Sequence, residues 1–133
     1  MLRATFLTVH WPLLVAASLA LLAVRPFPSK LFSYAERAEK LAARFLELRG
    51  GFLSGPRRFP WPPVAELASL HQAFKNLDCP DEARSYHWAV SEAMRLDLDA
   101  LACESHLERA LVLKEANRYW MRASEEARRF TAA

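Results

Sequence analysis

An uncharged stretch near the start of the chain places the strongest constraint on how this protein can fold. Between Arg3 and Arg25 there is no Asp, Glu, Lys or Arg, and the middle of the stretch reads HWPLLVAASLALLAV. A helix across this interval, at 1.5 Å per residue, reaches about 30 Å, which matches the hydrocarbon thickness of a bilayer. The sequence therefore predicts one transmembrane anchor, residues 1–25, with no room for a second span.

Pro12 and a possible signal peptide both bear on this prediction. A helix from Pro12 to Val24 would cover only about 20 Å, so the span must run through the proline. The short basic start is also compatible with a secretory signal, but Pro26 stands just past the candidate cleavage site and disfavours cleavage there. We therefore expect a retained anchor rather than a removed signal.

Small and aromatic residues have expected roles within the span. Ala16, Ala20 and Ala23 recur at helical spacing and form a small-residue face of the kind that lets membrane helices pack closely. Alanine is also common in hydrophobic segments, and the pattern alone does not separate the two explanations. Trp11 lies near the N-terminal end of the span, where an indole ring prefers the headgroup boundary.

Basic residues are unequally distributed about the span. Arg3 alone precedes it. The basic residues that follow it most closely are Arg25, Lys30, Arg37 and Lys40. The positive-inside rule then places the body of a single-pass protein in the cytoplasm of a bacterium or in the mitochondrial matrix. We favour the mitochondrial inner membrane.

Residues 26–62 are expected to form a linker, an amphipathic helix and a proline-rich loop. Ser33 and Glu36 have the spacing of a capping box, so the helix should begin at Ser33, and Gly50 and Gly51 should end it. Its apolar positions alternate steps of four and three residues: Tyr34, Ala38, Leu41, Phe45, Leu48 and Phe52. This stripe suits the core of the body or another subunit, and we favour the core.

Basic and aromatic residues next to the span and in the loop are the expected contacts with lipid headgroups or with a partner. Arg25 and Lys30 follow the span directly. Arg57, Arg58 and Trp61 lie in the stretch GFLSGPRRFPWPP, residues 51–63, whose prolines favour an extended backbone. We expect these side chains to face lipid phosphates, including those of anionic phospholipids, or the acidic groups of a partner.

Residues 63–133 are expected to hold a helical hairpin and a long C-terminal helix. The first helix should run from Pro63 to about Leu77, and an acidic turn should lead into the second. The hairpin has five apolar positions at characteristic offsets: Leu67, Leu70, Phe74, Ala83 and Tyr86. In these positions residues 67–97 resemble a tetratricopeptide repeat, which implies a helix pair that binds a protein partner. His71 departs from the pattern, because that family generally has a small residue there.

Two arrangements suit the C-terminal region. A second repeat would need a turn near Asn117, which is the strongest turn residue available there. The alternative is one long helix from Asp99 to Phe130 with an unbroken apolar stripe: Leu113, Ala116, Trp120, Ala123, Ala127 and Phe130. We favour the long helix slightly.

The sequence offers little chemistry. Cys103 and His106 are three apart, as two metal ligands on one helix would be, but nothing at an organised spacing completes a zinc site. Cys79 and Cys103 lack the spacing of a disulfide framework and are expected to be reduced thiols. A net charge of only +3, with basic and acidic residues mixed, argues against nucleic-acid binding. We expect no catalytic residue, no metal, no cofactor and no small-molecule substrate.

These observations predict an all-α protein, with one N-terminal transmembrane helix followed by a small helical bundle or a short tetratricopeptide-like array. The expected function is that of a non-catalytic accessory subunit of a multi-subunit membrane complex, of the respiratory-chain or ATP synthase kind. Its partners would be other subunits and membrane lipid. The alternative is a membrane-tethered adaptor that binds a protein through its helical hairpin.

Overall fold

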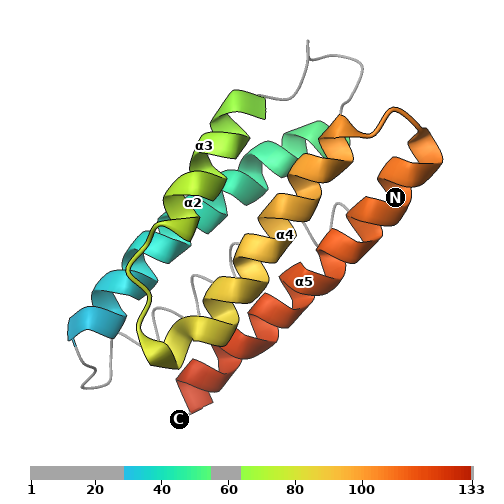
Figure 1. The fold of residues 1–133 in the computed structure, drawn as a ribbon. Helices are drawn as coiled ribbons and strands as arrows, with labels where there is room; N and C mark the ends of the chain where they lie inside the picture. Colours follow the sequence, from blue (N-terminus) through green and yellow to red (C-terminus); the bar gives the residue numbers. More distant parts are fainter. Residues whose placement is uncertain (1–28, 55–63, 133) are drawn as a thin grey trace.

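The part of the chain that the structure describes is built from antiparallel helices. The computed structural model describes residues 29–54 and 64–132. Its elements are α2 (Ser29–Ser54), α3 (Val64–Lys75), the short 3-10 helix η1 (Asp81–Ala83), α4 (Arg84–Ala102) and α5 (His106–Ala132). Successive α-helices run in alternating directions and pack as a small bundle (Figure 1). The predicted all-α class is confirmed for these residues.

The predicted anchor is not among the described elements. No helix in residues 29–54 or 64–132 combines the length and the hydropathy that a bilayer crossing requires. The expected span, residues 1–25, lies outside these ranges and stays a prediction.

The first described helix, α2, begins earlier than the capping box indicates. It starts at Ser29, directly after Pro28 in the sequence, whereas Ser33 is an exposed residue inside the helix. Leu31 is buried in the core and extends the apolar stripe by one turn toward the N-terminus. Burial of a leucine side chain contributes about 1.5–3 kcal/mol, more than a capping interaction of about 1 kcal/mol, so the core contact decides where the helix starts.

The helix also continues past the two glycines that were expected to end it. It runs through Gly50 and Gly51 to Ser54, and Gly51 does not have the left-handed backbone of a helix-terminating glycine. Leu46 and Arg49, just before the glycines, are both buried. Their packing holds the last turns of α2 in helical form although glycine in a helix costs roughly 0.5–1 kcal/mol relative to alanine.

The helical hairpin predicted from residue 63 onward is present. Leu67 and Phe74 of α3 are buried, and Leu70 and Leu77 pack against the core from partly buried positions. The predicted inward face of the following helix is also buried, at Ala83, Tyr86, Val90, Ala93 and Met94. The connection begins with two backbone bonds, from the N–H of Asn76 to the carbonyl of Gln72 and from the N–H of Leu77 to the carbonyl of Phe74.

The long helix expected from Asp99 is interrupted. α4 ends at Ala102, Cys103 has an extended backbone, and α5 begins at His106. Ser105 caps α5, because its hydroxyl oxygen accepts a bond from the N–H of Glu108 at 3.4 Å. Arg109 closes the end of α4 by donating to the carbonyl oxygens of Ala100 at 3.2 Å and Cys103 at 2.7 Å.

Beyond this break, α5 is continuous, so the turn near Asn117 required by a second repeat is absent. Ala116, Trp120, Ala123 and Ala127 of the predicted stripe are buried, and Leu113 is partly buried. The C-terminal helix of the structure therefore starts at His106, seven residues later than the sequence pattern indicated. The break turns the chain back on itself, so that α4 and α5 form a second antiparallel pair (Figure 1).

Alanine dominates the surfaces where the helices meet. The buried alanines are Ala35, Ala38, Ala42, Ala83, Ala89, Ala93, Ala100, Ala116, Ala123 and Ala127. Small side chains allow close approach of helix backbones. The larger side chains that complete the core are Phe45, Leu46, Phe74, Val90 and Met94, together with the indole of Trp120.

The course of α2 through the glycines generates the first testable prediction. A β-carbon added at Gly51 would meet nothing within 4 Å, so Gly51→Ala should raise the free energy of unfolding by about 0.5–1 kcal/mol. The measurement is urea unfolding of the full chain in a mild detergent, followed by far-UV circular dichroism. Ala110→Gly, at an exposed position of α5, is the matched control and should lower stability by about 1 kcal/mol. A loss of stability in Gly51→Ala would mean that α2 ends at the glycines.

Candidate functional site

A buried charged network joins three of the helices. Arg49 of α2 and Asp97 of α4 are only 7% and 3% exposed. Nε of Arg49 lies 2.8 Å from Oδ2 of Asp97, close enough for an ion pair although this N–H is not aligned as a hydrogen-bond donor. The indole Nε1–H of Trp120 in α5 donates to the same carboxylate oxygen at 2.9 Å. Nη2 of Arg49 donates to Oδ1 of Asn117, also in α5.

The surroundings of Asp97 argue for a structural role. Burial raises the pKa of its carboxyl group, and the opposing effects of the Arg49 guanidinium and the Trp120 N–H reduce this rise. Its second oxygen, Oδ1, has no hydrogen-bond partner among the described residues. Both charged side chains are almost fully buried and are paired with each other, which is the arrangement of a structural ion pair. It fixes the position of α2 on the α4–α5 pair.

Removal of one member of this network should destabilise the protein strongly. Asp97→Ala leaves the Arg49 charge buried without its partner, and we expect a loss of about 3–5 kcal/mol in the free energy of unfolding. The double variant Arg49→Met with Asp97→Leu should lose less, because no unpaired charge remains. Urea unfolding in mild detergent measures both.

The exposed pair Asp81 and Arg84, 2.9 Å apart, supplies the control for this comparison. Asp81→Ala should cost less than about 1 kcal/mol, because solvent screens the pair. A double variant that is less stable than Asp97→Ala would contradict the proposed cost of the unpaired charge.

An aromatic cluster lies where α2 meets the start of α4. The hydroxyl of Tyr34 and Nδ1 of His87 are 2.9 Å apart, and the ring of Phe74 stacks on the imidazole with centroids 4.8 Å apart. Burial lowers the pKa of His87 and raises those of Tyr34 and of the nearby Cys79 thiol. Each shift favours the neutral form. Cys79 therefore lacks the depressed pKa of a nucleophilic thiol.

The lowered pKa of His87, and that of His71, whose pKa burial also lowers, predict a pH dependence. In the unfolded chain both imidazoles regain an ordinary pKa near 6.5, so the unfolded state binds more protons as the pH falls below that value. The free energy of unfolding should therefore decrease between pH 7.5 and 5.5 and level off once both folded-state pKa values are passed. Urea unfolding at several pH values, at constant ionic strength, measures the slope.

Glutamine variants test the assignment of this slope. His71→Gln with His87→Gln should flatten the pH dependence over that interval. His106→Gln, at an exposed position outside the cluster, should leave it as in the parent. An equal slope in all three proteins would assign the effect to other groups.

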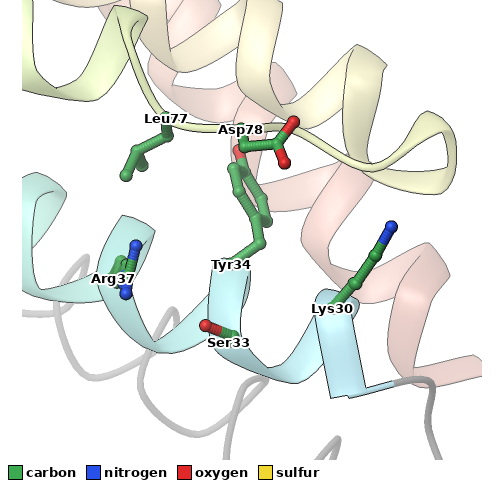
Figure 2. A pocket seen from close by; sticks show the side chains of 6 residues that line it. All are labelled: Lys30, Ser33, Tyr34, Arg37, Leu77 and Asp78. Atoms are coloured by element: carbon green, nitrogen blue, oxygen red, sulfur yellow. The ribbon is translucent and has the colours of Figure 1, made fainter.

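A surface pocket lies beside the first three turns of α2. It has a volume of about 370 Å³ and is lined by Lys30, Ser33, Tyr34, Arg37, Leu77 and Asp78. The first four belong to α2, and the last two belong to the connection after α3, which crosses above them in Figure 2. Lys30 and Arg37 are exposed, and neither forms an ion pair within the described residues. The pocket therefore offers two available cations to a ligand, with one carboxylate opposite them.

Large apolar side chains are exposed on the α4–α5 side of the bundle. Leu107 and Leu111 are 72% and 60% exposed, and Met121 is 52% exposed. Trp88 of α4 is 45% exposed, with the edge of Tyr119 against it and the guanidinium of Arg122 at 5.2 Å from its ring centre. Exposed apolar groups that gather on one side of a protein mark contact surfaces.

Only one of the residues predicted to contact helices or lipid falls in the described ranges. Lys30 lies on the exposed side of α2 and lines the pocket. The other predicted residues lie outside these ranges: Trp11, Ala16, Ala20, Ala23, Arg25, Arg57, Arg58 and Trp61. Arg37, Leu77 and Asp78 were not predicted as site residues. Helical spacing could have indicated Arg37, because it lies two turns after Lys30 on the same side of α2. No sequence signal pairs α2 with residues 77 and 78.

Cys103 and His106, the two residues with the spacing of metal ligands, are separated by the break between α4 and α5. Cys103 caps the end of α4, whereas His106 is the first residue of α5. Within residues 29–54 and 64–132 there is no group of three or more His, Cys, Asp or Glu side chains placed to hold a metal ion. Cys79 and Cys103 are both free thiols.

Comparisons with protein families, curated proteins and solved structures identify no relative. No family model matches the chain, and no curated protein or solved structure matches it significantly. The likeness of residues 67–97 to a tetratricopeptide repeat therefore has only the residues named above to support it.

Proposed function

We propose that this protein is a non-catalytic accessory subunit of a multi-subunit membrane complex, held by a single N-terminal span. The complex is of the respiratory-chain or ATP synthase kind, and the mitochondrial inner membrane is the favoured location, with the helical body in the matrix. In a bacterium the equivalent side is the cytoplasm. The subunit supports the complex by helix packing, through the alanine face of its span and an exposed surface of its body.

The exposed outer face of α5 is the observation that carries this proposal. Leu107 and Leu111 are one turn apart, and Lys114 and Arg118 follow them at steps of seven residues on the same stripe. Met121 continues the stripe toward the C-terminus. A leucine exposed by itself is ordinary, but a stripe of exposed apolar and basic side chains suits an interface with another subunit.

The short connection to the predicted span supports a position at the membrane surface. Ser29, where α2 begins, is only four residues beyond Arg25. Four residues of extended chain reach at most about 14 Å. The body of an anchored chain would therefore stay against the bilayer, where neighbouring subunits of a membrane complex are within contact distance.

Substitution on this face tests the proposal. Leu107→Ser with Leu111→Ser should leave the fold stable, because both side chains are exposed, but should reduce the amount of protein that migrates with a large complex on native gels after mild detergent extraction. Val64→Ser alters a similarly exposed apolar residue of α3 and should keep the parent pattern. A parent protein that is alone and monodisperse after such extraction, or that alkaline carbonate releases intact from membranes, would overturn the proposal.

The alternative function is a membrane-tethered adaptor that binds a protein through the α3–α4 hairpin. The buried positions of Leu67, Phe74, Ala83 and Tyr86 favour it, because they suit the helix pair that the tetratricopeptide resemblance implies. An adaptor would leave its partner on detergent extraction, whereas a subunit would co-migrate with one complex. Mass spectrometry of the proteins that purify with the tagged full chain distinguishes the two.

A further inference from the structure

The pocket beside the start of α2 has the chemistry of a phosphate site. Lys30 and Arg37 are separated by seven residues, which places them on one side of the helix about 10 Å apart along its axis. Ser33 and Tyr34 lie between them along the helix, and all four line the same cavity of about 370 Å³. The lysine ammonium and the arginine guanidinium are the usual protein partners of phosphate oxygens.

The other groups around the cavity limit what it can hold. The Tyr34 hydroxyl is already paired with Nδ1 of His87, so the polar contacts left for a ligand are Lys30, Arg37 and the Ser33 hydroxyl. Leu77 supplies an apolar wall, and the Asp78 carboxylate faces the cavity from the connection above α2 (Figure 2). The Asp78 carboxylate repels an anion, so the site should bind phosphate with moderate affinity. Neutralisation of Asp78 should strengthen this binding.

We propose that this pocket binds a phosphate ester, held between Lys30 and Arg37 with Ser33 as a further donor. The geometry of the chain points to a phospholipid headgroup as the source. Lys30 is five residues beyond Arg25, so extended chain separates them by at most about 18 Å. This choice of source rests on the proposed membrane anchor, whereas the phosphate chemistry of the pocket does not.

The test measures phosphate-ester binding by the full chain in dodecyl maltoside. Native mass spectrometry, titrated with phosphatidic acid, gives the apparent Kd of the parent and of Lys30→Gln with Arg37→Gln. We expect at least tenfold weaker binding in this variant. Asp78→Asn should bind several-fold more tightly than the parent. The matched control is Lys114→Gln with Arg118→Gln, which removes the same two charge types from the outer face of α5 and should change the Kd less than twofold.

The second arm identifies the source of the phosphate. Inorganic phosphate replaces the lipid as the titrant, and its binding is followed by the broadening of its phosphorus resonance. Binding of phosphatidic acid at least tenfold tighter than that of inorganic phosphate supports the headgroup. Equal affinities that both depend on Lys30 and Arg37 would keep the phosphate site but overturn the lipid source.

The remaining outcomes separate this inference from the proposed function. If the Lys30/Arg37 variant and the Lys114/Arg118 variant weaken phosphatidic acid binding equally, the proposed pocket is wrong, because any surface cation would then serve. Co-migration with a complex would still support the proposed subunit function. If carbonate releases the chain but phosphate binding still requires Lys30 and Arg37, the proposed function fails and the phosphate site holds. Circular dichroism of each variant checks that the helical fold is intact.

Discussion

The contacts of Asp97 with Arg49 and Trp120 determine how α2 fits on the α4–α5 pair. Most of the core is apolar and built from small side chains, and apolar packing is tolerant of small shifts in helix position. A charge pair buried among three helices is not tolerant, because a displacement of α2 would leave one charge without its partner in a medium that does not solvate it. The pair thus selects one arrangement of α2 on the α4–α5 hairpin.

Each candidate surface depends on how its own helix packs in the bundle. The pocket needs the first turns of α2 to lie under the connection that carries Leu77 and Asp78, so it exists only where α2 is seated on its neighbours. The outer face of α5 is the side left over when Ala116, Trp120 and Ala123 turn inward. The seating of α2 therefore positions the polar pocket at one end of the bundle, and the packing of α5 on α4 leaves the apolar and basic stripe on the outer side.

Periodicity predicted the helices better than it predicted their ends. The apolar spacing in α2, α3, α4 and α5 identified most of the buried positions, because a helix that packs on one side repeats that side every three to four residues. Where a helix begins or ends depends on the balance between local capping or glycine signals and the burial of nearby side chains. Ser105 and Glu108 have the spacing of a capping box, but the uninterrupted stripe downstream suggested that the helix began earlier. Gly50 and Gly51 resembled a stop, yet buried residues before them keep α2 helical.

The candidate sites were harder to predict because they join residues distant in the sequence. Lys30 could be identified from its position after an uncharged segment, but its pocket is completed by residue 78, which no local pattern links to it. Arg49 lies next to the apolar stripe of α2, and periodicity gives no sign of the carboxylate that balances it at position 97. Partners of this kind are set by tertiary packing alone.

The alternating course of the helices has a consequence for the far terminus. Because α2, α3, α4 and α5 reverse direction in turn, the end of α5 returns to the end of the bundle where α2 starts (Figure 1). If the proposed anchor holds the start of α2 at the membrane, the C-terminal end of α5 lies close to the same membrane surface. A tag fused there would compete for space with lipid, whereas the 103–105 bend lies at the opposite end of α5 and is a better place to attach a label.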